Sequence, residues 1–406
     1  LNPSMFENFG QDTAKSTAVA FAVGVYVLLN TGPTVFTSEK GSLWLLFSFP
    51  HSVDQVLRRK AYLWALVGML YCSAVLIWSW ATAPSLPLAT LFTAGMALFG
   101  MPVFSLLSAS LAIIGADPMG ESTKQKLPAT MVYLFLMLAG MYGYGFYQSP
   151  WTQVSMMVLF AMLALAMWQN VGDRVPYLLD PTRLPPPKAS LSDGMIAVLV
   201  FFVLQTIVSA AVLNQVSTGP ALLLSFAVAG ALVFVIFVFM LWRRHVPQLL
   251  VALGYRCVAS DRPSRLRTLA WGLGSGGVAG LGALGYGWVS LHIEPLRLLM
   301  EKSKMSSAEL GPDFYRWFFV LAVLAAPLFE EFIFRALVFR GLRRSSGFAM
   351  AALTSAAVFA IVHPAYSMIP VFGLGLAAAL SLEKGGRMLA PMLAHAVYNA
   401  IVLLVM

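Results

Sequence analysis

Charged residues are scarce in this chain. Of its 406 residues only 11% are Asp, Glu, Lys or Arg, whereas 59% are hydrophobic and the mean hydropathy is +0.79. Soluble domains carry about 25% charged and roughly 45–50% apolar residues. The shortage of charge therefore excludes an ordinary soluble domain, and lipid is the expected solvent of most of the chain.

Cysteine is nearly absent. Cys72 lies in an apolar run and Cys257 in an Arg-rich loop, so the sequence offers no disulfide framework and no cysteine that is placed for catalysis. Residues 1–13 lack the basic start and the small-residue cleavage site of a signal peptide, and the chain begins with Leu1 rather than Met. We expect a processed or incomplete beginning.

Basic residues outnumber acidic ones, which gives a net charge of +9. The 26 Lys and Arg lie mostly in short loops between apolar runs, without a basic domain or an aromatic RNA-binding pattern, so nucleic acid is not an expected partner. They concentrate in every second loop, which predicts that both termini lie outside. We expect a multi-pass protein of a prokaryotic plasma (inner) membrane.

Long apolar runs are abundant. A helix needs about 20 apolar residues to cross about 30 Å of hydrocarbon, and these runs lack the alternation of barrel strands. They predict an all-α, polytopic transmembrane helix bundle with about twelve spans and no large soluble domain. The predicted spans lie near residues 16–31, 61–81, 86–114, 127–147, 151–170, 194–214, 219–242, 268–291, 314–340, 350–369, 370–383 and 388–405.

One connection marks a domain boundary. Residues 173–193 bring together prolines and charges that cannot continue a membrane helix. They predict a separate membrane region at 1–180 and a second bundle at 190–406.

Another long connection, residues 243–267, is strongly basic. An ordinary cytoplasmic loop is the favoured interpretation, and contact with anionic lipid headgroups is the alternative. In the span that follows, Gly272, Gly276 and Gly280 predict close packing of a neighbouring helix.

An amphipathic segment at 39–60 has the sequence EKGSLWLLFSFPHSVDQVLRRK. Its acidic residue, Leu-rich stretch, Pro50 and later Lys60 resemble the coupling-helix region of ABC-2 type transporter permeases. The resemblance implies a permease-like region at 1–180, with an ABC ATPase or another membrane subunit as partner. The alternative is an interfacial helix that lies flat on the membrane and has no role in transport.

Three charges occupy one apolar stretch, LFEEFIFRALVFRG. Glu331 and Arg335 are spaced i to i+4 and can pair on one helix face, whereas Glu330 lies about 100° away round the helix. Ionisable groups inside a bilayer usually face a protein interior or water. The pattern predicts a structural carboxylate at Glu331 and a reactive one at Glu330; a purely structural ion pair is the alternative.

Two histidines follow on later spans. FAIVHP places His363 four residues after Phe359 and directly before Pro364, and HAVYNA places His395 and Asn399 one turn apart. Either histidine alone is more simply a hydrogen-bonded core residue. Together with Glu330 they offer a base, a water-orienting imidazole and neutral donors.

These motifs, EExxxR from Glu330, FxxxH from Phe359 and HxxxN from His395, resemble those of the CPBP (Abi) family of CAAX-type prenyl endopeptidases and bacteriocin-processing or self-immunity membrane proteins. The resemblance covers about residues 314–406. It implies an intramembrane endopeptidase in which Glu330 and His363 activate water. It further implies that His395 and Asn399 hold the oxyanion, and that three residues support the site: Glu331, Arg335 and Phe359.

The resemblance leaves the role of a metal open. No cofactor is favoured, but Glu330, His363 and His395 would make a three-ligand zinc site with water in the fourth position. The sequence has no HExxH, and we favour a metal-independent glutamate mechanism in a hydrated cavity open to the cytoplasm.

The expected partners are a membrane-associated protein or peptide substrate and the lipid bilayer. Two rival functions remain: a transporter permease, and a noncatalytic membrane scaffold that binds a partner without hydrolysing it.

Overall fold

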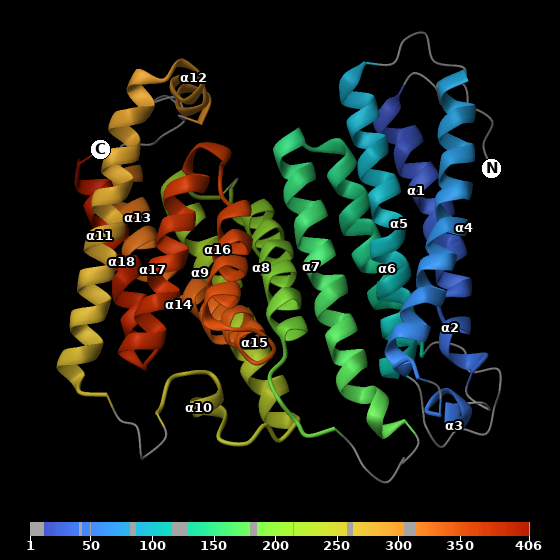
Figure 1. The fold of residues 1–406 in the computed structure, drawn as a ribbon. Coiled ribbons are helices and arrows are strands. Elements are labelled where there is room, and N and C mark those ends of the chain that lie inside the picture. Colours follow the sequence, from blue (N-terminus) through green and yellow to red (C-terminus); the bar gives the residue numbers. More distant parts are fainter. Residues whose placement is uncertain are drawn as a thin grey trace. The chain divides into compact units, whose positions relative to one another are not determined.

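The computed structural model describes residues 12–39, 43–48, 50–81, 87–115, 128–178, 185–213, 215–257, 263–303 and 313–405. Every regular element within these ranges is a helix (Figure 1), which confirms the all-α prediction. The chain divides into two compact units, unit 1 from Leu1 to Pro186 and unit 2 from Pro187 to Met406.

Unit 1 consists of long helices with short ones near their ends. In chain order they are α1 (Thr13–Thr31), α2 (Thr34–Thr37), α3 (Leu43–Leu46), α4 (Val53–Ala81), α5 (Leu88–Gly115), α6 (Ala129–Tyr144), η3 (Gly145–Tyr147), α7 (Pro150–Arg174) and η4 (Val175–Tyr177).

An aromatic cluster around α5 forms the core of unit 1. The ring of Phe104 lies 5.3 to 5.7 Å, between centroids, from the rings of Phe21, Phe135, Tyr142 and Phe160. The buried Tyr142 hydroxyl donates to the carbonyl oxygen of Met96 at 2.8 Å. Because aromatic pairs bury much apolar surface and the hydroxyl is satisfied, this cluster holds α1, α5, α6 and α7 together.

The segment that resembles a coupling helix is described only in part. The structure shows the short helix α3 and the start of α4, with Lys60 paired to Glu39. Residues 40–42 and 49 lie outside the described residues. The permease resemblance and an ABC partner therefore stay predictions.

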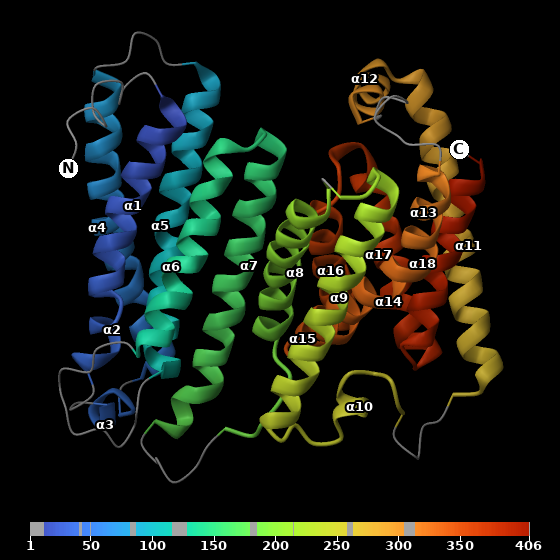
Figure 2. The same ribbon diagram turned by 180° about the vertical axis from the view of Figure 1, so that it is seen from behind.

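Unit 2 (Figure 2) also consists of long helices with shorter helical segments between them. In chain order they are α8 (Leu191–Val212), α9 (Thr218–Arg243), α10 (Leu249–Ala252), α11 (Arg265–His292), α12 (Glu294–Ser303), α13 (Phe314–Val320), η5 (Leu321–Ala325), α14 (Ala326–Glu331), η6 (Phe332–Phe339), α15 (Arg340–Arg343), α16 (Phe348–Ile361), η7 (Ala365–Ser367), α17 (Met368–Gly385) and α18 (Leu389–Val405).

Nine helices within the described ranges are long and apolar enough to cross a membrane, five in unit 1 and four in unit 2. The chain is thus a multi-pass integral membrane protein, but the predicted count of about twelve spans is not confirmed. Helix α11 is 28 residues long yet rich in glycine, and α16 and α18 have only 14 and 17 residues.

The predicted boundary between the tenth and eleventh spans is wrong. The predicted span at 350–369 stops early, because α16 ends at Ile361 and Pro364 follows in an extended conformation with ψ 143°. Because proline disfavours a helical conformation in the residue before it, α16 stops ahead of Pro364, and the chain makes the short turn η7 before α17 starts at Met368. The eleventh predicted span, 370–383, is correspondingly longer in the structure.

The glycines of α11 lie where close packing was predicted. Helix α11 packs on α17 and α18. A Cβ atom on Gly272 would come within 2.9 Å of the Ala390 carbonyl oxygen, and one on Gly280 within 3.0 Å of Ile401. Gly276 lies closest of all, against the backbone of Ala394, which confirms the prediction of a glycine-lined interface.

We expect Gly276→Ala to destabilise the protein by about 1–3 kcal/mol, because its methyl group would overlap the α18 backbone. The matched change Gly274→Ala has open space within 4 Å. It should be neutral or stabilise by up to about 1 kcal/mol, because alanine is the better helix former. Thermal unfolding in detergent measures both, and equal shifts of the two variants would contradict the packing described here.

Candidate active site

The two adjacent glutamates lie on one continuous helical stretch from Phe314 to Arg343. Two segments of this stretch, η5 and η6, are π-helical, and they flank the short α-helix α14 that ends in Glu330 and Glu331. Widened π turns inside α-helices are rare and are frequent at functional sites. Pro327 accounts for the first one in part, because it has no N–H to donate to the preceding turn.

Glu331 and Arg335 form the predicted pair. Both side chains are fully buried, and Glu331 Oε2 lies 3.0 Å from Arg335 Nε. The Nε–H does not point at the oxygen well enough for a hydrogen bond, so the attraction is mainly between charges. The guanidinium carbon also lies 4.7 Å from the ring centroid of Phe359, which adds a cation–π contact from α16.

His395 joins the same pair from α18. Its Nδ1 lies 2.8 Å from Glu331 Oε1, and its Nε2 lies 3.8 Å from Glu330 Oε2. Because a carboxylate paired with arginine is ionised and can only accept, Nδ1 carries the proton and donates to Glu331. The imidazole therefore has one nitrogen fixed by the structural carboxylate and the other directed toward Glu330.

His363 stands at the end of α16. Its Nδ1 lies 2.8 Å from the carbonyl oxygen of Phe359, and since a carbonyl only accepts, Nδ1–H is the donor. In the neutral ring Nε2 is then the acceptor. The ring of Phe359 lies 4.8 Å from that of His363 and 5.8 Å from that of His395, so this fully buried side chain contacts both imidazoles edge to face.

Glu330 and His363 line one cavity of about 70 Å³. Its other walls are mainly apolar and come from α8, α9, η6 and the end of α16: Val198, Phe201, Phe202, Gln205, Phe226, Ile333, Phe334 and Val362. A site for one water needs about 10–15 Å³, so the space is sufficient, and the carboxylate and imidazole supply polar partners. The structure thus brings the expected acid and the expected imidazole to one small cavity.

Asn399 lies apart from this cavity. Its Nδ2 donates to the carbonyl oxygen of Ala322 at 2.5 Å. In a π turn that carbonyl would receive the N–H five residues later, which is absent because residue 327 is proline. The asparagine side chain replaces the missing donor and ties α18 to η5, so its amide is not directed to the cavity as an oxyanion donor.

Sequence reasoning missed the contribution of α8 and α9. Gln205 is the polar residue that α8 presents to the cavity, beside Phe201 and Phe202. A polar amide within the apolar run FFVLQTIV was a usable signal, because polar groups in a membrane helix usually face an interior or a cavity.

The alternative zinc site needs three converging ligands. Among the described residues no three His, Cys, Asp or Glu side chains are grouped so that they could hold a metal ion. The fixed Nδ1 atoms of both histidines leave their Nε2 atoms as the possible ligand atoms. Whether the reaction uses zinc stays a prediction.

Residues 312–401 match the family model described as type II CAAX prenyl endopeptidase Rce1-like. The match includes all three motifs and is consistent with the CPBP resemblance. Comparison of the chain with curated proteins and with solved structures gave no match.

Removing one member of the buried pair should be costly. We expect Arg335→Met to destabilise the protein by about 3–5 kcal/mol, because it leaves the Glu331 carboxylate buried without its counter-charge. The double variant Glu331→Gln/Arg335→Met should recover much of that loss. Arg316→Met, which breaks an exposed pair with Asp313, should cost about 1 kcal/mol or less. Thermal unfolding in detergent compares the three, and an equal loss in Arg335→Met and Arg316→Met would refute this account.

Proposed function

Since residues 312–401 match the family model described as type II CAAX prenyl endopeptidase Rce1-like, we propose that this chain is an intramembrane endopeptidase that hydrolyses a peptide bond of a membrane-associated protein or peptide. The observation that supports this function is the cavity shared by Glu330 and His363. A carboxylate and an imidazole around a water-sized space, inside a bundle of apolar helices, can activate water for attack on a carbonyl group.

In the proposed reaction Glu330 is the general base. It takes a proton from a water molecule while the water oxygen bonds to the scissile carbonyl carbon, and the carbonyl electron pair moves to its oxygen. When the carbon–nitrogen bond breaks, the proton on Glu330 passes to the leaving amine. His363 orients the water, because its Nδ1–H is held on Phe359 and its Nε2 accepts a hydrogen bond.

Other residues position Glu330 and His363 or stabilise the negative charge that develops on the carbonyl oxygen. The contact with Glu331 fixes the ring of His395, whose Nε2 faces Glu330. The family resemblance assigns the oxyanion to His395 and Asn399, but the Asn399 amide serves only if it leaves Ala322. The Gln205 amide already lines the cavity and offers a further donor.

Loss of the base should abolish cleavage without unfolding the protein. We expect Glu330→Gln to lower the cleavage rate about 10²- to 10⁴-fold, because the amide cannot accept the proton. Its melting temperature should stay close to that of the wild type, since the Glu331–Arg335 pair is intact. Mass spectrometry compares the new peptide termini in membranes from cells that carry the wild type or the variant, and the differences identify the substrate. The cleavage rate of that substrate is then measured with each purified protein.

Glu294→Gln is the matched control, because it removes an exposed carboxylate at the start of α12. It should leave cleavage unchanged. If Glu330→Gln kept the same new termini as the wild type, the proposed mechanism would be wrong. If no new termini depended on the wild-type protein at all, a noncatalytic scaffold would be favoured.

Dialysis against EDTA tests the metal alternative. The proposed mechanism predicts full activity after dialysis, because the water is activated by Glu330 and His363. Activity that is lost and then restored by zinc would instead assign Glu330, His363 and His395 as metal ligands.

A further inference from the structure

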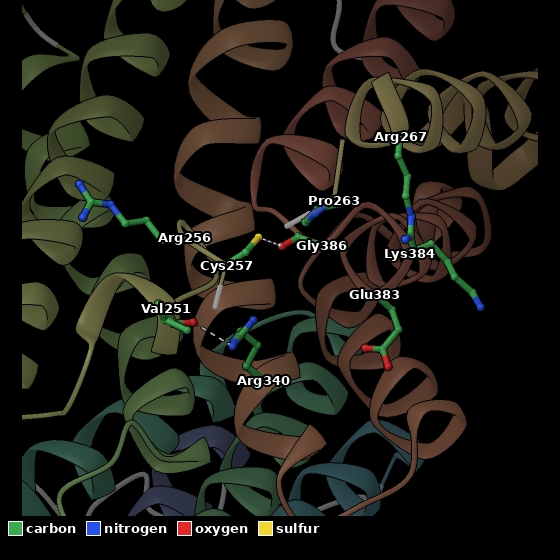
Figure 3. Close-up of a pocket in the computed structure, with 9 residues that line it drawn as sticks. All are labelled: Val251, Arg256, Cys257, Pro263, Arg267, Arg340, Glu383, Lys384 and Gly386. Carbon is green, nitrogen blue, oxygen red and sulfur yellow. Dashed lines mark hydrogen bonds between the residues drawn. The ribbon is translucent and has the colours of Figure 1, made fainter. Parts of the chain in front are cut away.

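A second polar pocket lies in unit 2, near α10, away from Glu330 and His363. It has a volume of about 200 Å³, and its charged lining residues are Arg256, Arg267, Arg340, Lys384 and Glu383 (Figure 3). A neighbouring pocket of about 410 Å³ shares Arg340 and Glu383 and adds Arg343 and Arg344. Among the described residues, the lining of the two pockets thus includes six cationic residues and one carboxylate, Glu383.

The backbone around the first pocket is fixed by contacts that depend on glycine. Gly254 and Gly386 are the two glycines with a left-handed backbone in the described part of the chain, with φ 82° and 73°. A Cβ on Gly254 would lie 3.1 Å from Arg340 Nη1, and one on Gly386 would lie 2.8 Å from Pro263. Both positions favour glycine for two reasons: the positive φ and the close approach of a neighbouring residue. The backbone of the pocket wall is therefore preformed.

Two hydrogen bonds visible in Figure 3 close this wall. Arg340 Nη2 donates to the carbonyl oxygen of Val251 at 3.0 Å, and Cys257 Sγ donates to that of Gly386 at 3.1 Å. They join the α10 loop to the helices that carry Arg340 and Gly386. The loop is therefore part of a built site rather than an independent surface.

The positive charge of the two pockets is only partly neutralised. Arg343 pairs with Glu383 at 2.8 Å, whereas Arg340 donates to the neutral carbonyl of Val251. The charged groups of three further residues have no hydrogen-bond or ion-pair partner within the described ranges: Arg256, Arg267 and Lys384. A net positive pocket of this kind attracts an anion.

Interaction with helix dipoles does not account for these cations. Lys384 stands at the end of α17, where a positive charge is favourable. Arg267, however, lies in the first turn of α11, where the helix dipole disfavours a cation and where that helix has no acidic residue. The partial positive charge at the N-terminus of α11 therefore adds to the positive potential of the pocket.

The pocket lies where membrane helices end. The apolar stretch Phe314–Arg343 ends beside it, the stretch Ala365–Gly385 ends at its wall, and α11 begins there at Arg265. This is the level of lipid headgroups, and basic pockets between helix ends can bind anionic headgroups. We propose that this pocket binds the phosphate of an anionic phospholipid.

The test is lipid binding to the purified full chain in uncharged detergent, followed by native mass spectrometry. Phosphatidylglycerol should bind as a discrete adduct, and phosphatidylcholine should bind at least about tenfold more weakly because its headgroup has no net charge. Arg267→Gln/Lys384→Gln should weaken phosphatidylglycerol binding about 25-fold, at about a factor of five per cation.

The control Arg243→Gln/Arg265→Gln removes the same charge from exposed residues at the end of α9 and the start of α11 that do not line the pocket. It should change binding less than about threefold. Equal losses in the two double variants would overturn the proposal in favour of general surface attraction. Displacement of the lipid by inorganic phosphate at equal concentration would overturn it in favour of a site for free phosphate.

Glu383→Gln should increase lipid binding, and an increase cannot be explained by misfolding. This variant removes the carboxylate of the pocket and releases Arg343, so it should tighten phosphatidylglycerol binding about fivefold. Unchanged or weaker binding would contradict the site. The measurement reports lipid and not cleavage, so its outcome does not depend on the proposed peptidase function.

Discussion

The buried contact of Glu331 with Arg335 and His395 is the constraint on which the arrangement of unit 2 depends. Charges in an interior surrounded by hydrocarbon persist only with partners. Glu331 and Arg335 share one helical stretch, His395 comes from α18, and Phe359 of α16 covers the guanidinium. One ion pair therefore fixes three helices. Glu330, the residue before Glu331, is outside this ion pair and lines the cavity with His363.

The π turns show how this helix accommodates such neighbours. Pro327 removes a backbone donor just before the two glutamates, and Asn399 on α18 supplies a replacement at Ala322. The defect in one helix is thus repaired by a side chain of another, which makes the wide turn η5 a point of attachment. The motif alone suggests a catalytic role for Asn399, whereas in the structure its side chain links α18 to η5.

Local spacing explains what the sequence could predict. The Glu331–Arg335 pair follows from an i to i+4 separation, and the interface of Gly276 follows from a small-residue face, because both depend on one helix. The predicted end of the tenth span is wrong although Pro364 is a local signal. The length of the turn after Pro364 depends on where α17 packs, which the local sequence does not specify. The Asn399–Ala322 bond was not predicted, because it joins segments far apart in the chain and no local pattern encodes that contact.

The level of each helix decides whether the acid and the imidazoles meet. At an α-helical rise of 1.5 Å per residue, the end of α16 at Ile361, just before His363, lies about 20 Å from Phe348, whereas His395 lies only about 9 Å from Leu389. Helices that were parallel and began at one level would keep these side chains apart, so their starts and tilts must differ. Arg340 on Val251 and Arg344 on Ala189 fix the basic end of the glutamate helix to its neighbours. The contacts at that end therefore help to set the depth at which Glu330 meets His363.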